Sequence, residues 1–165
     1  MLLLLETERL ILRPLTDDDA PFIVELLNQP SFLENIGDKG VRTPEDALRY
    51  LHEGPVASWA RHGHGLYAVE LAETGEAIGM CGLLKRDDLD HPDLGYAYLT
   101  RFWKNGYALE AARAVIAAAP HPGTLLAMVT PANHGSIRLL EKLGFQRAAD
   151  HLDHPDASMY SRQIP

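Results

Sequence analysis

The stretch TRFWKNGYALEAARAVIAAA, Thr100 to Ala119, joins a turn with aromatic and cationic side chains to an alanine-rich helical run. The first N–H groups of a helix have no partner inside the helix, and the helix dipole places about +0.5 charge at that end. Gly106 would let a ligand approach this backbone more closely than a residue with a Cβ atom would. The stretch therefore predicts either a phosphate-binding helix start or an ordinary one, and it does not by itself choose between them.

The size and composition of the chain indicate one domain with its own core. The chain has 165 residues, of which 46% are hydrophobic, and we expect a single domain over residues 1–165. Cys81 is the only cysteine and lies in the apolar run AIGMCGLL, so we expect a buried thiol in a reducing compartment. No disulfide is needed.

Charge and the first residues exclude two classes of partner. The net charge is −8, from 15 basic and 23 acidic residues, which argues against binding to nucleic acid. The opening MLLLL leads directly into Glu6 and Glu8 and is far shorter than a membrane span or a signal-peptide core. We therefore expect a soluble, cytoplasmic protein with no membrane partner. The sequence leaves a homodimer open.

Apolar periodicity and turn residues predict an α+β fold. The expected elements, in order, are a strand at 9–15, helices at 16–28 and 42–63, strands at 65–71, 76–86 and 93–99, a helix at 104–119, a strand at 124–130, a helix at 133–143, and strands near 145–149 and 157–163. Gly54-Pro55 is expected to break or kink the second helix. The strand–helix–strand unit from Asp93 to Thr130 should pair two parallel strands in an otherwise antiparallel sheet.

Three segments carry a resemblance to a known family. The segment WKNGYALEA resembles the motif Gln/Arg-x-x-Gly-x-Gly/Ala of RimJ/RimL-like members of the GNAT acetyltransferase superfamily, with Trp103, Gly106 and Ala108 at the three fixed positions. NHGSIRLLEKLGFQ (Asn133–Gln146) resembles the family segment Asn-x-x-Ser-x-x-x-x-Glu-Lys-x-Gly-Phe. TERLILRPLTDDDA (Thr7–Ala20) resembles the first strand and helix of the family. The resemblance covers almost the whole chain.

The resemblance implies a fold and an activity. The fold would be a GNAT-like three-layer α+β domain, with a mixed, mostly antiparallel sheet of about seven strands, splayed between strands 4 and 5 and flanked by about four helices. The activity would be direct transfer of acetyl from acetyl-coenzyme A to a primary amine in a ternary complex. The amine could belong to a protein N-terminus or to a small molecule. The alternative is a non-catalytic coenzyme A-binding module with the same fold.

The same resemblance assigns the cofactor-binding residues. Backbone N–H groups from Lys104 to Ala108 would receive the pyrophosphate, and the backbone near Tyr98 and Leu99 would receive the pantetheine arm. The full set is Tyr98, Leu99, Trp103, Lys104, Asn105, Gly106, Tyr107, Ala108, Asn133 and Ser136. Neither Gly-Lys-Ser/Thr nor Gly-x-Gly-x-x-Gly occurs in this stretch, so we expect neither ATP nor NAD as the cofactor.

Two residues are candidates for the chemical step. Asp93 opens the fourth predicted strand, where family members often carry an acid, and would accept the proton of the amine; as an alternative it is a solvated turn residue. His91 and Glu34 are lesser candidates. Many superfamily members use a tyrosine to protonate the leaving thiolate, and this chain has Leu140 there. Ser136 is expected to supply the hydrogen bond instead.

The remaining polar groups have plainer interpretations. The pairs His62/His64 and His151/His154 have loose metal-like spacing, but no cysteine or acid cluster completes a site in the sequence, so we expect no metal. Glu110 should support the helix start and a neighbouring backbone segment. The acceptor cleft is expected between Leu33 and Gly63, which carry no motif.

Overall fold

The computed structural model describes residues 4–120 and 122–165 and contains one eight-stranded sheet. The strands are β1 (Leu5–Glu6), β2 (Leu10–Pro14), β3 (Leu66–Leu71), β4 (Ala77–Leu84), β5 (Asp93–Tyr98), β6 (Gly123–Val129), β7 (Gln146–Arg147) and β8 (Ser158–Ile164). Their order across the sheet is β1-β2-β3-β4-β5-β6-β8-β7. Among the strand pairs that the described residues form, only β5–β6 is parallel, which confirms the predicted mixed sheet. The first three residues of the MLLLL run lie outside the described residues.

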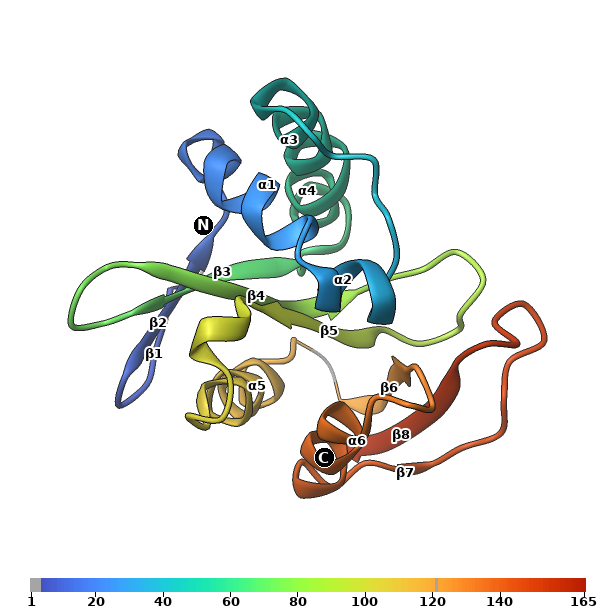
Figure 1. Ribbon diagram of the computed structural model, residues 1–165. Coiled ribbons are helices and arrows are strands. Elements are labelled where there is room, and N and C mark those ends of the chain that lie inside the picture. The colour runs from blue at the N-terminus through green and yellow to red at the C-terminus, as the bar shows by residue number, and fades with distance from the viewer. Residues whose placement is uncertain (1–3, 121) are drawn as a thin grey trace.

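Helices cover both faces of this sheet and give the domain three layers (Figure 1). They are α1 (Ala20–Leu27), α2 (Pro30–Asn35), α3 (Pro44–Leu51), α4 (Ala57–His62), α5 (Tyr107–Ala117) and α6 (His134–Lys142). Helices α1 to α4 lie on one face, and α5 and α6 lie on the other. Each layer of helices buries its own apolar cluster against the sheet. The α+β fold with three layers is therefore confirmed, with strand β1 and helix α2 added to the expected elements.

Local sequence signals account for the helix boundaries. The Thr43 hydroxyl accepts a hydrogen bond from the Asp46 N–H at 3.1 Å, and Pro44 occupies the first position of α3, where its missing N–H costs nothing. The Gly54-Pro55 pair was expected to break or kink the helix. It lies in a π-helical turn, His52–Val56, which connects α3 to α4 without an intervening loop.

The sheet divides where β5 meets β6. The two strands pair only at Asp93 and Leu126, beside a hydrogen bond of 2.9 Å from the Leu126 N–H to the Pro92 carbonyl. Beyond this point toward Tyr98 the strands do not pair, as the resemblance predicted. Their unpaired backbone groups face an opening that leads to the start of α5. Among residues 4–120 and 122–165, no helix has the length and apolar character needed to cross a bilayer.

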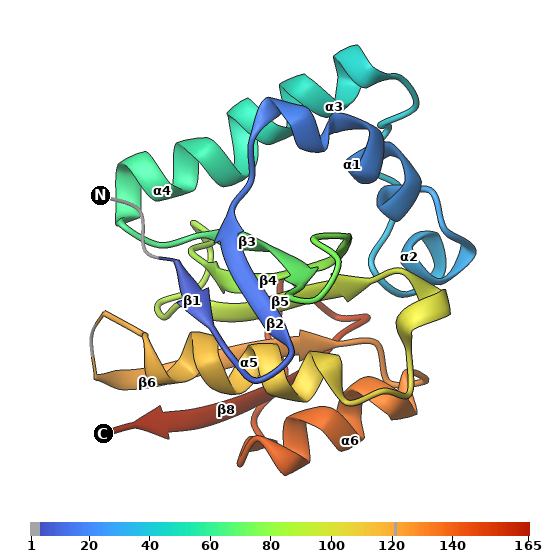
Figure 2. The same ribbon diagram turned by 90° about the vertical axis from the view of Figure 1, so that its left-hand side faces the viewer.

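The carboxylate of Glu110 connects the segment between β1 and β2 to α5. Glu110 accepts hydrogen bonds from the Thr7 hydroxyl at 2.5 Å, the Arg9 N–H at 2.9 Å and the Arg9 Nε at 2.8 Å. In Figure 2 the turn between β1 and β2 reaches α5 at this place. Burial acts to raise the pKa of Glu110, but the hydrogen bonds from Thr7 and Arg9 outweigh it and hold that pKa below its ordinary value. Glu110 therefore has the supporting role that the sequence predicted.

Replacing Glu110 with glutamine should destabilise the fold by about 1–3 kcal/mol at neutral pH, because charged hydrogen bonds are lost while the shape is kept. The folded-state pKa of Glu110 is lowered, so its contribution is present above the ordinary pKa of 4.5 and is lost as the pH falls through the folded-state value. Urea unfolding at pH 7 and at about pH 3 should show a difference from wild type that shrinks in acid. Glu141→Gln, at an exposed position of α6, should show neither effect.

Candidate active site

The start of α5 is open and has an unusual backbone. Lys104 and Gly106 have φ of 65° and 81°, in the left-handed region, and residues 103 to 106 are all exposed. Within the described part of the chain, no side chain caps this helix, which is also true of α1, α2 and α4, whereas Thr43 caps α3 and Asn133 caps α6. The N–H groups of the first turn of α5 therefore point outward without a side-chain partner. This arrangement suits an anion such as phosphate.

The Arg9 guanidinium, which forms an ion pair with Glu110, also lies beside the same turn. Its Nη1 donates to the Asn105 carbonyl at 2.9 Å, and its guanidinium lies 4.5 Å from the centre of the Tyr107 ring. A Cβ atom on Gly106 would stand 3.3 Å from Arg9 Nη2 and would project into the space over the turn. The residues present thus fit a pyrophosphate group. Sequence reasoning did not include Arg9, because it lies 96 positions before Asn105.

The direction of the backbone of β5 corrects one expectation. The Leu99 N–H donates to the Ile78 carbonyl at 2.9 Å, so this group faces β4 and is not free to receive a pantetheine arm. Residues of an antiparallel strand turn their backbone groups alternately to one side and the other. The backbone groups of Tyr96 and Tyr98 therefore face the opening toward β6, although the Tyr98 carbonyl already accepts from the Trp103 Nε1 at 3.0 Å.

Two hydroxyl groups meet across this opening. Tyr96 on β5 and Ser136 on α6 form a hydrogen bond through their side chains, and the Ser136 N–H donates to Asn133 Oδ1 at 3.3 Å. Burial, the largest cause, raises the pKa of Tyr96 to about 12, so the phenol is protonated at neutral pH. Leu140 is fully buried in the core, so it has no polar role. The sequence analysis missed the Tyr96 side chain, because its partner lies 40 positions away on another element.

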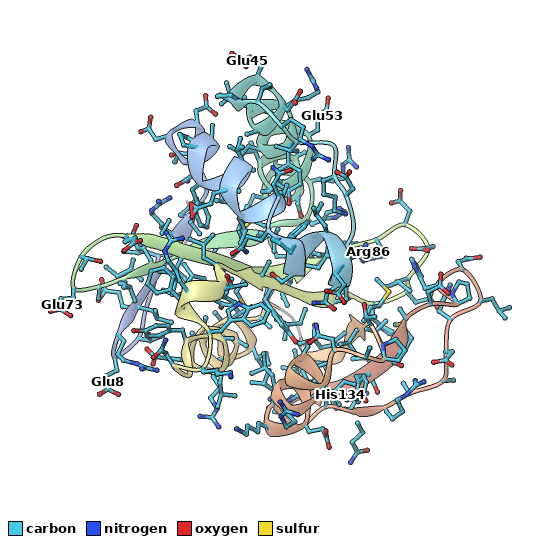
Figure 3. The ribbon with its side chains drawn as sticks, in the orientation of Figure 1. Glu8, Glu45, Glu53, Glu73, Arg86 and His134 are labelled. Atoms are coloured by element: carbon cyan, nitrogen blue, oxygen red, sulfur yellow. The ribbon has the colours of Figure 1, made fainter. Side chains whose placement is uncertain are left out.

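Asp93 is buried on the opposite face of β5. Its exposed fraction is 2%, and its carboxylate lies 3.2 Å from the Nε of Arg86, which follows β4 at the end of the sheet where β5 begins (Figure 3). Burial, the largest cause, raises the pKa of Asp93, and the charge and hydrogen bond of Arg86 act against it. Asp93 is thus not a solvated turn residue. His91 and Glu34, the lesser candidates, are both exposed.

A cleft of about 280 Å³ lies on the same face as Asp93. It runs between the π-helical turn His52–Val56 and the ends of β3 and β4, and its lining includes Tyr50, Arg61, Lys85 and Arg86. Burial raises the pKa of the Tyr50 hydroxyl to about 12. One wall of this cleft comes from the segment between Leu33 and Gly63 in which the acceptor cleft was expected. Arg61, Lys85 and Arg86 outnumber Glu53, the acidic residue in the lining, so the cleft has an excess of basic groups, of which Arg86 is paired with Asp93.

The fold is an α+β domain with a split sheet and an uncapped helix start at the open end of the split, and comparison with known proteins identifies its family. Residues 9–146 match a family model described as "Acetyltransferase (GNAT) domain". The chain belongs to the GNAT acetyltransferase family, and this membership indicates acetyl transfer as its general activity.

Individual relatives agree with this assignment. The chain is 30% identical over 149 residues to the Bacillus subtilis protein described as "Uncharacterized N-acetyltransferase YoaA", covering 87% of this chain and 83% of the relative. A solved acetyltransferase from Agrobacterium tumefaciens is 30% identical, with a TM-score of 0.83 over 98% of this chain and 95% of that chain. A ribosomal-protein-S5-alanine acetyltransferase from Vibrio fischeri is 19% identical, with a TM-score of 0.75 over 98% and 97%, and shows a shared fold.

Replacing Arg86 with methionine should raise the pKa of Asp93 further, because the charge that lowers it is removed. The ionised carboxylate would then be buried without its partner, so stability at pH 7 should fall by about 1–3 kcal/mol. This loss should shrink as the pH falls and Asp93 becomes protonated. Denaturant unfolding across pH 4 to 8 measures the effect. Arg42→Met, which removes an exposed ion pair with Asp38, should change stability little at any pH.

Proposed function

We propose that this protein binds acetyl-coenzyme A and transfers its acetyl group to a primary amine. The observation that carries the proposal is the uncapped, exposed start of α5 at the open end of the split between β5 and β6. The cofactor supplies an activated acetyl thioester and a pyrophosphate-bearing handle. The backbone N–H groups from Lys104 to Ala108 would hold that pyrophosphate, and the Arg9 guanidinium, which keeps its ion pair with Glu110, would add hydrogen-bond donors beside it.

The unpaired backbone of β5 would position the pantetheine arm. The N–H groups of Tyr96 and Tyr98 face the opening, where they can bind amide groups as an added strand does. An N–H group there can also polarise the thioester carbonyl, as the donors of an oxyanion hole do. Asn133 would serve the arm from the start of α6 while it caps that helix. Exposed Trp103 lies beside the phosphate-binding turn.

The proton transfers would be divided between the two faces of β5, with Asp93 on one face and the hydroxyl pair of Tyr96 on β5 and Ser136 on α6 on the other. Asp93 would accept the proton of the amine, directly or through water, and its raised pKa makes it a stronger base than an exposed aspartate. Tyr96 and Ser136 would donate a hydrogen bond to the leaving sulfur. The amine would thus arrive from the α1–α4 side, and the thiol would leave on the side of α5 and α6.

The acceptor class is proposed from the family and from the cleft. A protein N-terminus, as used by RimJ/RimL-like enzymes, or a small amine would enter the cleft beside Arg86. The positive character of the cleft favours an acceptor that carries an acidic group near its amine. The reduced, buried thiol of Cys81 is compatible with a cytoplasmic location. Thiol release from acetyl-coenzyme A with a panel of amines and short peptides tests the proposal. Binding without release in every case would support the non-catalytic module instead.

Gly106→Val should lower the affinity for acetyl-coenzyme A at least tenfold, or about 1.4 kcal/mol, because the new side chain would stand between the backbone and the pyrophosphate. The positive φ of 81° also strains the variant by roughly 1–2 kcal/mol. Gly63→Val is the matched control, because Gly63 has φ of 73° and open space around it at the end of α4.

Calorimetric titration with acetyl-coenzyme A measures the effect of both valine variants, and circular dichroism checks their fold. The control should share the strain and keep wild-type affinity. A folded Gly106→Val protein that binds acetyl-coenzyme A as tightly as wild type would refute the phosphate assignment. In that case a pantetheine thioester without phosphate groups should bind as well as the full cofactor.

Ser136→Ala and Tyr96→Phe should each lower kcat by about 10–100-fold with little change in cofactor affinity, because the hydroxyl pair acts mainly in the transition state. The kcat of the double variant should be at most a few-fold below that of the slower single variant, because the two hydroxyls act through one hydrogen bond. Steady-state kinetics of thiol release measure this. Unchanged kcat in both single variants would leave the pair a packing contact and exclude it as the proton donor.

A further inference from the structure

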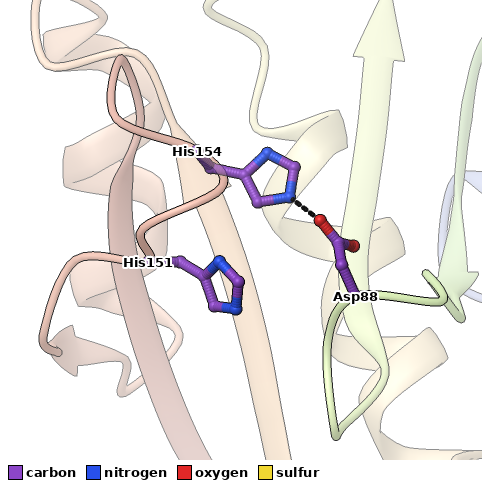
Figure 4. Close-up of side chains that lie close together, drawn as sticks. All are labelled: Asp88, His151 and His154. Carbon is purple, nitrogen blue, oxygen red and sulfur yellow. Dashed lines mark hydrogen bonds and ion pairs between the residues drawn. The ribbon is translucent and has the colours of Figure 1, made fainter.

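Two loops that are distant in the sequence bring three metal-ligating side chains together. Asp88 lies between β4 and β5, and His151 and His154 lie between β7 and β8 (Figure 4). One ligand atom from each residue lies within 4.8 Å of the others. The His154 Nε2 and the Asp88 Oδ2 are 2.6 Å apart, and the two imidazole rings have centroids 5.5 Å apart. All three side chains remain partly open to solvent.

This cluster supplies the acid that the sequence did not reveal. The spacing of His151 and His154 was set aside because no acidic residue completed it. In the folded chain the Asp88 carboxylate lies against the His154 imidazole, although the two residues are 66 positions apart in the sequence. By contrast His62 and His64 stack at 5.6 Å, and among the described residues no acid completes a group of three with them.

Two imidazoles and one carboxylate match the ligand preference of a zinc-type ion. Zn²⁺ binds histidine nitrogen and carboxylate oxygen at about 2.0–2.2 Å, which places neighbouring ligand atoms of a tetrahedral site about 3.3 Å apart. The distance between the His154 nitrogen and the Asp88 oxygen would increase slightly as the ion replaces the proton between them. The His151 ring would move toward the ion. Movements of this size are small for side chains on exposed loops.

We propose that Asp88, His151 and His154 form a binding site for a divalent transition-metal ion of the zinc type, with water in the fourth position. The ion would connect the loop after β4 to the loop before β8. These loops belong to the two parts of the sheet, which pair through only Asp93 and Leu126 between β5 and β6. A bound ion would therefore hold the two parts together at the closed end of the split. This inference does not depend on the proposed acetyl transfer.

Calorimetric titration of Zn²⁺ into the full chain, without a polyhistidine tag and after treatment with a chelator, tests the proposal in the absence of acetyl-coenzyme A. We expect saturable binding of one ion per chain. Mg²⁺ should not compete, because it prefers six oxygen ligands. Absence of saturable Zn²⁺ binding would overturn the proposal and leave the cluster a hydrogen-bonded contact between the loops.

Three variants locate the site. Asp88→Asn and His154→Ala should each weaken Zn²⁺ binding at least tenfold, while His62→Ala, in the other histidine pair, should not change it. Wild-type affinity in both site variants, or an equal loss in His62→Ala, would assign the ion to another place and overturn the proposal. Asp88→Asn keeps the shape of the side chain, so it remains informative should His154→Ala fold poorly.

Hydrogen exchange gives a second readout that a site elsewhere would not reproduce. Addition of Zn²⁺ should slow exchange in residues 85–92 and 148–157 together, because one ion would hold both loops. Asp88→Asn should abolish this protection in both loops at the same Zn²⁺ concentration. Protection of one loop alone, or protection that survives in Asp88→Asn, would contradict the three-residue site.

Discussion

Strands β5 and β6 run parallel and pair through a single residue pair, Asp93 with Leu126, before they part. Backbone groups that lose their partner strand in this way need other hydrogen-bond partners, because an unpaired N–H or carbonyl group in a protein interior costs free energy. The opening between the strands therefore leaves the N–H groups of Tyr96 and Tyr98 without a partner strand. Helix α5 begins beyond the open end of β5, so an uncapped helix start lies at the open end of the same split.

The alternation of side chains along β5 separates the chemistry of the site into two environments. Leu94, Tyr96 and Tyr98 pack toward α5 and α6, while Ala97 and Leu99 pack toward α1 to α3. Asp93 shares the second face, where Arg86 is its partner. The Asp93 carboxylate and the Tyr96 hydroxyl therefore lie on opposite faces of one strand, each with a different partner.

Features of this architecture could be predicted from the sequence where the residues that produce them are close together in the chain. The caps at Thr43 and Asn133 and the helix start at Gly106 are local features, so nearby residues suffice to predict them. The parallel pairing of β5 and β6 followed from the helix between them. The direction of the Leu99 N–H was not predictable, because it depends on the phase of the hydrogen bonds between β4 and β5.

Side-chain contacts between segments that are distant in the sequence could not be predicted. The hydrogen bond of Tyr96 with Ser136 and that of His154 with Asp88 each join side chains that no periodicity connects. The same is true of Arg9, which reaches both Asn105 and Glu110 from the first strands. Each of these partners is an ordinary polar residue in its own segment. Only the packing of the elements shows which ones meet.

The turn before α5 illustrates how such distant contacts hold a local backbone conformation in place. A left-handed conformation at Lys104, a residue with a Cβ atom, costs roughly 1–2 kcal/mol and persists only where neighbouring contacts hold it. The Asn105 side chain donates to the Phe102 and Trp103 carbonyls at 3.1 Å, and Arg9 holds the Asn105 carbonyl. The turn is thus ordered before any ligand arrives. Because its conformational entropy is already lost on folding, more of the interaction with an anion remains as binding free energy.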